Sequence, residues 1–467
     1  MADLIERVDW GAYREEAAEF LSELIQIDTT NPPGNETAAA RFLLERFTKE
    51  GIPGEILEGE PGRGNFIARL TGRGGGAGPK LLFLSHTDVV PVADPSRWTH
   101  PPFSGVIADG WVWGRGALDM KGQAVVEALV MFLFKRLGVE FHGELIYLAV
   151  ADEERGGGKG AGWLLAEHPE LLKVDYVINE GGGAPLKLGD RIFYPIENVE
   201  KGVLWLELKV RGRSGHGSIP HEDNALAKAA RLIDRVASYR FPKRIAPSVE
   251  KFITKVMEAI EPAGAGRQAA RAILSPGEEP EPAELARLLE GTPLGPNLVN
   301  AFIRTTISPT MVRAGVKENV IPDGCELVLD CRLIPGSTRE EVLAKLEELA
   351  REAGLAPEDL QVEVLQYHPP SESPVETDFY RAIEKALLEE LPEVEAVPFL
   401  LTGATDSRFL REAGALAYGF CPLSTKMDLS ERMRLVHGDN ERIDLESLEL
   451  GVRVLARLAC ELLGAPT

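Results

Sequence analysis

The sequence predicts an α/β protein: a mainly parallel sheet covered by helices, interrupted by a smaller inserted α+β domain of ferredoxin-like topology. Two patterns support this prediction. Over the first 200 residues, apolar strand-like runs alternate with helical segments, which is typical of a parallel sheet with helices on both faces. From about residue 201 the order becomes strand, helix, insertion, two strands, helix, strand, as in a split βαβ sandwich. A chain of 467 residues is also too long for one ordinary core.

The larger domain is expected to comprise residues 1–200 and 369–467. It begins with an amphipathic helix at residues 10–25, for which Asp9 is the expected N-cap. A second helix, at about 36–50, ends at Gly51. The later elements are strands near 65–70 and 80–84, a Gly-punctuated loop at 111–119, a helix at 122–137, strands at 143–149 and 174–178, and a C-terminal helix at 445–463.

The inserted domain is expected to comprise residues 201–368. Its first strand, 203–210, alternates apolar and charged side chains, which is typical of a half-exposed strand. A Pro- and Gly-rich stretch with short helical pieces, near 246–300, is interpreted as an extra segment of this domain. The other predicted elements are a helix at 225–239, strands at 304–312 and 325–333, a helix at 338–353 and a strand at 361–366.

Charge and composition exclude several classes of partner. The formal net charge of −22 argues against binding to nucleic acid or to an anionic membrane. The N-terminus has no apolar signal region, and no run of about 18 apolar residues is present, so we expect a cytoplasmic protein without a membrane span. The four cysteines are sparse, as in a reducing compartment, and are interpreted as buried small hydrophobes. Cys325 and Cys331 could nevertheless face each other or opposite sides of one strand.

Acidic and histidine side chains follow three of the predicted strands. His86 and Asp88 close one apolar run, the pair Glu153 and Glu154 follows the next, and Glu180 follows a third. In an open α/β sheet the carboxyl ends of the strands face one crevice, where ligands and metals bind. His86 and Asp88 are two residues apart on an extended segment, so both can point to one side, and the carboxylate can orient the imidazole.

Each of these residues also has an ordinary structural explanation. Asp119 could be the N-cap of the helix at 122–137, and His86 could cap a turn. Their convergence nevertheless favours a hydrolytic metal centre. Carboxylates and imidazoles without thiolates suit zinc, cobalt or manganese better than copper(I). Because adjacent residues point apart, either Glu153 or Glu154 could bind metal while the other faces the water, and the sequence does not order the pair.

The motifs resemble those of the M20 metallopeptidase and amidohydrolase family, in order and over nearly the whole chain. The matching segments are Ser85–Asp88, Trp113–Gly116, Asp119–Gly122, Asp152–Glu154, Glu180, Ser214–His216, Asn319–Pro322 and His437–Glu441. Met120 stands where many members have Asp, at a position that is not a ligand. The Gly181–Gly183 run and the segment near 246–300 most resemble the carboxypeptidase S branch.

The resemblance implies a site with two metal ions, usually zinc. Asp119 would bridge the ions, with His86 and Glu180 on one ion and Glu154 and His437 on the other. Asp88 would orient His86, and Glu153 would be the general base.

The resemblance also implies roles for the inserted domain, as a lid and as the contact of a homodimer, although a monomer stays possible. His216 would donate to the tetrahedral oxyanion, often from the partner subunit, and Arg332 and Asn319 would hold a substrate carboxylate. The alternatives are a His in a Gly-flanked turn and a surface Arg paired with Asp330 or Glu326. No role is assigned to the remaining histidines, which are His100, His142, His168, His221 and His368.

The expected function is metal-dependent hydrolysis of an amide or peptide bond in a small carboxylate-bearing substrate. An N-acyl amino acid, a dipeptide or a C-terminal residue would each fit. The alternative is a non-catalytic, metal-dependent binding or scaffold protein on the same fold, which the intact Glu153 argues against. A phosphate-binding loop is excluded, because the Gly156–Gly158 run is not followed by Lys-Ser or Lys-Thr.

Overall fold

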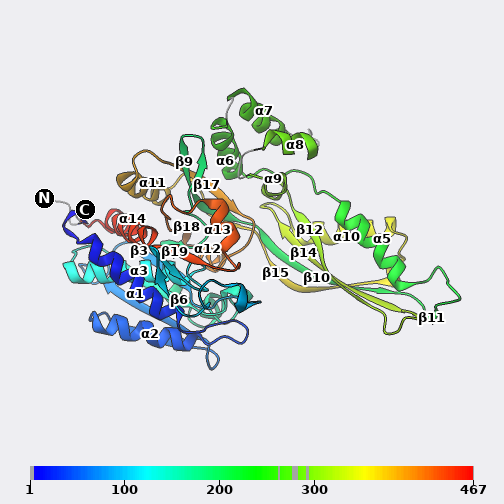
Figure 1. Cartoon of the computed structure of the whole chain (residues 1–467), viewed down its shortest axis with the longest axis horizontal. Helices are drawn as coiled ribbons and strands as arrows, with labels where there is room; N and C mark the ends of the chain where they lie inside the picture. Colours follow the sequence, from blue (N-terminus) through cyan, green and yellow to red (C-terminus); the bar gives the residue numbers. More distant parts are fainter. Residues whose placement is uncertain (1–4, 261–262, 276–281, 291–293, 466–467) are drawn as a thin grey trace.

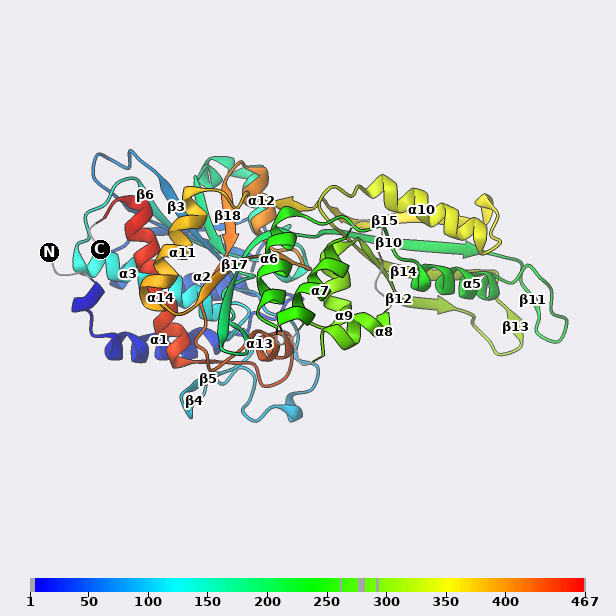
Figure 2. The same cartoon turned by 90° about the horizontal axis from the view of Figure 1, so that it is seen from above.

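The computed structural model describes residues 5–260, 263–275, 282–290 and 294–465. The chain folds into a larger and a smaller part (Figure 1). A large mixed sheet with helices forms one part, and a narrow four-stranded sheet with two long helices extends from it (Figure 2). The predicted α/β fold class, with an inserted smaller α+β unit, is confirmed. Among the described residues, no helix is both long and apolar enough to cross a membrane.

The large sheet has the strand order β1-β2-β6-β3-β7-β18-β9-β16, and β8 and β17 also pair with β9. Its central strands, β6, β3, β7 and β18, are parallel, as the alternation of strands and helices predicts. Antiparallel pairs flank them on both sides. The strands are β1 (Gly54–Glu58), β2 (Gly64–Thr71), β3 (Lys80–His86), β6 (Glu144–Val150), β7 (Tyr176–Asn179), β8 (Leu186–Leu188), β9 (Arg191–Glu200), β16 (Ser371–Glu372), β17 (Glu395–Leu401) and β18 (Leu416–Gly419).

Helices cover both faces of this sheet because alternate residues of its strands are apolar on both sides. On β3, Leu81 and Phe83 face one hydrophobic cluster, whereas Leu82 and Leu84 face the other. The helices of the first cluster are α1 (Trp10–Ile25), α2 (Glu36–Lys49), α3 (Lys121–Leu137), α11 (Asp378–Glu390) and α14 (Leu445–Leu463). Those of the second are α4 (Ala161–Glu167) and α12 (Ser407–Glu412). As predicted, Asp9 caps α1, where its carboxylate accepts a hydrogen bond from the backbone N–H of Ala12 at 3.2 Å.

The segment predicted as a loop at 111–119 contains a short strand. This strand, β5 (Trp111–Trp113), pairs with β4 (Ile107–Ala108) and with β19 (Arg442–Asp444). The pairing with β19 joins residues far apart in the chain, so local glycine content could not reveal it.

The smaller sheet is antiparallel, in the order β12-β14-β10-β15, which is a ferredoxin-like arrangement. Its strands are β10 (Gly202–Arg211), β12 (Thr306–Ala314), β14 (Gly324–Leu333) and β15 (Leu360–His368). One face packs against α5 (Ala225–Ser238) and α10 (Arg339–Glu352) through residues such as Leu206 and Leu329. The other face exposes apolar side chains, among them Trp205 and Met311. At its far end, β11 (Gly215–His216) pairs with β13 (Val320–Ile321).

The predicted extra segment near 246–300 packs against the large sheet. It contains α6 (Pro247–Glu258), α7 (Ala263–Leu274), α8 (Pro282–Leu288) and α9 (Pro296–Ile303), and parts of it lie outside the described residues. Phe252 of α6, Phe302 of α9 and Phe399 of β17 meet edge to face, with ring centroids 5.5–5.7 Å apart. The place of a segment in the chain does not fix which sheet its apolar side chains cover.

Candidate metal centre

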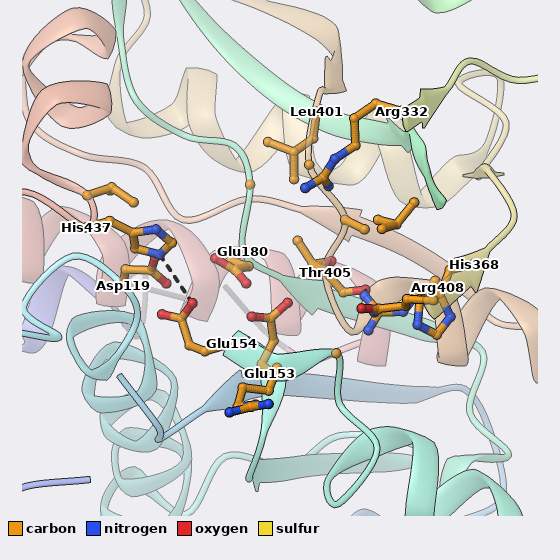
Figure 3. Close-up of a pocket in the computed structure, with 18 of the residues that line it drawn as sticks. Asp119, Glu153, Glu154, Glu180, Arg332, His368, Leu401, Thr405, Arg408 and His437 are labelled. Carbon is orange, nitrogen blue, oxygen red and sulfur yellow. Dashed lines mark hydrogen bonds and ion pairs between the residues drawn. The ribbon is translucent and has the colours of Figure 1, made fainter. Parts of the chain in front are cut away.

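The predicted cluster forms at the carboxyl ends of the parallel strands. His86 is the last residue of β3, Glu153 and Glu154 follow β6, and Glu180 follows β7. Asp119 precedes α3, and His437 follows the short helix α13 (Leu429–Leu435). Figure 3 shows Asp119, Glu153, Glu154, Glu180 and His437 around one pocket.

Asp119 contacts both histidines, one through each carboxylate oxygen. Nε2 of His86 lies 3.1 Å from Asp119 Oδ1 and 3.6 Å from Glu180 Oε1. Nε2 of His437 lies 3.0 Å from Asp119 Oδ2 and 3.2 Å from Glu154 Oε2. Within each of these two groups of three, the donor atoms all lie within 4.8 Å of one another. A carboxylate that serves two donor groups in this way has the geometry of a bridging metal ligand.

The electrostatics of the cluster fit divalent cations. Burial, followed by repulsion from neighbouring acids, raises the pKa of Glu153 and Glu154 and raises the pKa of Glu180 to about 8. Hydrogen bonds to Asp119 and Glu154 raise the pKa of His437 to about 10. Oε1 of Glu154 is buried and has no hydrogen-bond partner among the described residues. A cation would replace these protons and satisfy this orphan oxygen, so the donor set fits the expected ions.

Asp88 fixes the positions of three site residues. The backbone carbonyl of Asp88 lies 3.0 Å from Nδ1 of His86, and its carboxylate lies 3.5 Å away from the same atom. An Nδ1–H that donates to this carbonyl leaves Nε2 free to face the cluster. The carboxylate accepts hydrogen bonds from the backbone N–H groups of Glu153 at 3.1 Å and Glu154 at 3.2 Å, and from Nδ2 of Asn31 at 2.8 Å.

Glu441 joins the two loops that carry Asp119 and His437. Its Oε2 accepts a hydrogen bond from Nη1 of Arg115 at 2.6 Å, and Nη2 of Arg115 donates to the His437 carbonyl at 3.2 Å. Its Oε1 accepts from the backbone N–H groups of Gly116, Leu118 and Asp119 at 3.1, 2.8 and 3.0 Å. The sequence places Glu441 in the same motif as His437 but gives no indication of this role.

A cavity of about 380 Å³ opens in front of the cluster, between the large sheet and the smaller one. Glu153 lines it without belonging to either donor group. The smaller sheet contributes Val203, Trp205, Arg332, Gln366 and His368. The loop after β17 and the start of α12 contribute Gly403, Ala404, Thr405 and Arg408.

The three predicted residues of the inserted domain lie in different places. Arg332 lines the cavity and also pairs with Asp330, Nε to Oδ1 at 2.8 Å and Nη2 to Oδ2 at 3.2 Å. The pairing with Asp330 is the one that the alternative interpretation expects, and the role of Arg332 in holding a substrate carboxylate stays a prediction. His216 and Asn319 are exposed at the far tip of the smaller sheet, where the carbonyl of Asn319 accepts a hydrogen bond from the Gly217 N–H at 2.8 Å. A single chain therefore does not bring His216 or Asn319 to the cavity.

Sequence reasoning missed several cavity residues. His368, to which the sequence assigns no role, lines the cavity at the end of β15. Thr405 and Arg408 follow β17, so the rule that polar residues gather after parallel strands would have found them.

A family model described as "Peptidase family M20/M25/M40" matches residues 82–461. The chain belongs to this family. The N-fatty-acyl-amino acid synthase/hydrolase PM20D1 of Xenopus tropicalis is 28% identical over 467 residues, which cover 95% of this chain and 85% of that protein. Aminoacylase-1 of Sus scrofa is 27% identical over 458 residues, which cover 95% and 94% of the two chains.

Solved structures show the same fold. The M20 family metallo-carboxypeptidase Sso-CP2 from Sulfolobus solfataricus has a TM-score of 0.69 at 18% identity, and the match covers 95% of this chain and 98% of that one. Membership of the family and the hydrolases among these relatives support a metal-dependent hydrolase of amide bonds.

Proposed function

We propose that the protein hydrolyses the amide bond of a small carboxylate-bearing substrate, foremost an N-acyl amino acid, with dipeptides and C-terminal residues as further candidates. The observation that supports this most is that Asp119 is shared by two donor groups, with the half-buried acid Glu153 lining the same cavity. The named relatives, an N-fatty-acyl-amino acid synthase/hydrolase and an aminoacylase, favour acylated amino acids.

The proposed ligands are His86 and Glu180 for one ion and Glu154 and His437 for the other, with Asp119 shared. Zinc is the proposed metal, and cobalt or manganese would also suit oxygen and imidazole donors. When bound, such ions lower the pKa of water towards roughly 7 and polarise a carbonyl. Asp88, through its contacts to His86 and to the backbone of both glutamates, is proposed to hold this set in place.

Glu153 is the proposed general base. Its position in the cavity lets it accept a proton from the attacking water and deliver that proton to the nitrogen of the leaving amine. The Glu153 side chain is only partly exposed, and burial and neighbouring acids raise its pKa. Both effects suit a group that must take up a proton and then release it within one reaction.

The cavity walls suit an acylated amino acid. Arg332 and Arg408 supply positive charge, and Val203, Trp205 and Leu401 supply apolar surface. A free carboxylate and an apolar acyl chain or side chain could therefore bind in the same cavity.

We further propose that residues 1–200 and 369–467 hold the metals and that residues 201–368 contain the lid and the dimer contact. The exposed apolar side chains of the smaller sheet, which include Met311 and Val312, support a homodimer. In such a dimer, His216 and Asn319 of one subunit would complete the cavity of the other. All four cysteines are buried, which is compatible with the proposed cytoplasmic location.

The test is turnover of a panel of N-acyl amino acids and dipeptides by enzyme purified with added zinc or cobalt. Glu153→Gln should retain both ions and lose most turnover, by about 10²–10⁴-fold for a general base. The matched control is Glu19→Gln, an exposed residue of α1, which should behave as the parent. If Glu153→Gln turns over as fast as the parent, Glu153 is not the base. Metal binding without turnover of any substrate would favour the non-catalytic binding protein.

A further inference from the structure

Arg408 is buried, and no carboxylate in the part of the chain that the structure describes is hydrogen-bonded to its guanidinium. Its side chain is 8% exposed and lines the cavity, and its Nε has no hydrogen-bond partner among the described residues. Nη1 donates to the carbonyl of Thr405 at 2.5 Å. The carboxylate of Asp406 lies nearby, with Oδ1 4.0 Å from Nη2 of Arg408, which is beyond hydrogen-bond distance. A positive charge in this state is stabilised when an anion enters the cavity.

Arg332, by contrast, already has a carboxylate partner. Two of its nitrogens contact the two oxygens of Asp330, in the bidentate geometry that a substrate carboxylate would need. A substrate that binds there must compete with Asp330. Arg408 has no bidentate carboxylate partner among the described residues, since Asp406 lies 4.0 Å from Nη2.

The surroundings hold Arg408 in place. Thr405, whose carbonyl accepts from Arg408, donates its hydroxyl to Glu200 and accepts from Nδ2 of Asn179 at 3.2 Å. The guanidinium also lies over the ring of Phe409, 4.5 Å from its centroid. The charge is therefore fixed before any ligand binds, so little rotamer entropy is lost on binding.

The neighbouring histidine does not add a second positive charge. Burial, and then the charge of Arg408, lower the pKa of His368 to about 4, so its imidazole is neutral at neutral pH. Figure 3 shows His368 beside Arg408, on the side of the pocket away from Asp119 and His437. A neutral imidazole can donate a hydrogen bond to an anion that Arg408 attracts.

We propose that Arg408, rather than Arg332, is the main anchor for the free carboxylate of the substrate. This inference rests on the proposed function and narrows its substrate class. The preferred substrates are amides whose leaving amine carries a free carboxylate, as in N-acyl amino acids and C-terminal residues. The corresponding amino acid amides, which lack the negative charge, bind weakly.

Binding separates this proposal from the hydrolytic one. The probes are N-acetyl-L-leucine and its carboxamide, titrated calorimetrically into zinc-loaded Glu153→Gln protein, which binds without turnover. Arg408→Met, Arg408→Lys and Arg332→Met are made in the same background. The charge-matched control is Arg434→Gln, an exposed residue of α13 outside the cavity.

We expect Arg408→Met to weaken binding of the acid by about 10- to 100-fold, the usual range for a lost charged hydrogen bond, and binding of the carboxamide by less than about 3-fold. Arg408→Lys should recover part of the lost affinity for the acid, because lysine keeps the positive charge but lacks the planar guanidinium. Arg332→Met should weaken acid binding less, and Arg434→Gln should change neither affinity.

The assignment is wrong if Arg408→Met leaves the affinity for the acid unchanged, or if it weakens binding of the acid and of the carboxamide equally. It is also wrong if Arg332→Met weakens binding of the acid more than Arg408→Met does, or if the acid does not bind at all. The hydrolytic function is judged separately, by turnover of the parent enzyme. A parent that turns over amides but fails these tests keeps the proposed function and loses the Arg408 subsite.

Discussion

Replacement of Glu441 tests whether one buried carboxylate holds both halves of the metal centre. Glu441→Gln keeps a neutral oxygen for the three backbone N–H groups of the loop at 116–119. The variant loses the negative charge opposite Arg115, a residue that is only 2% exposed. Breaking a buried ion pair from one side costs about 3–5 kcal/mol, because the remaining charge stays buried without a partner.

The same substitution should weaken metal binding. Arg115 also donates to the carbonyl of His437, and Glu441 accepts from the N–H of Asp119, so both ligands lose support at once. Removal of a group that orients metal ligands typically costs about 10- to 100-fold in metal affinity. We therefore expect both a lower free energy of unfolding and weaker zinc binding.

Two measurements check the prediction: urea unfolding of the metal-free protein, and zinc affinity by competition with a chromophoric chelator. The control is Glu446→Gln, whose ion pair with Lys426 is about half exposed and should contribute no more than about 1 kcal/mol. If the two variants have equal unfolding free energies and equal zinc affinities, the bridging role of Glu441 is refuted.

Two further predictions concern protons. Burial raises the pKa of Glu127 to about 8, against 4.5 in the unfolded chain, so between these two pH values the folded state binds a proton that the unfolded chain has released. The free energy of unfolding should therefore fall as the pH rises from 4.5 to 8, by up to about 1.4 kcal/mol per pH unit. Urea unfolding of metal-free Glu127→Gln should show a shallower decline with pH than the parent, and an equal slope would contradict the assigned pKa. Removal of metal by a chelator should abolish turnover, and zinc should restore it while releasing protons at pH 7, because metal-free Glu180 and His437 hold protons there. Calorimetry in buffers of different ionisation enthalpy counts these protons, and a count of zero would exclude this protonated cluster.

The sequence was informative wherever a residue's role depends on its own strand. The continuous run of apolar residues in β3 predicts that both faces of this strand are buried. The position of His86 at the end of the same strand predicts that it lies at the carboxyl edge of the sheet. The carboxyl ends of parallel strands lie at one edge, so Glu154 and Glu180 could be placed near His86 without coordinates.

Roles that depend on distant contacts were not predictable in this way. Glu441 acts through N–H groups of a loop more than 300 positions earlier, and nothing in its local sequence indicates that partner. Arg408 is separated in the chain from Glu153, with which it shares a cavity. Short helical pieces are predicted near 246–300 and α6 is one of them, but only the contact of Phe252 with Phe399 shows that this helix covers the large sheet.

The packing of the helical segment on the large sheet explains how the cavity keeps its shape. Part of the cavity wall belongs to the smaller sheet, so the position of Arg332 relative to Glu153 depends on where β10 leaves the large sheet. Lys201, which is 1% exposed, stands at that point, and its Nζ donates to the carbonyls of Ala301 at 3.1 Å and Arg304 at 2.9 Å. The end of α9 is thus tied to the start of β10, while its Phe302 is anchored on β17. The helix α9 therefore braces the junction between the two sheets that line the cavity.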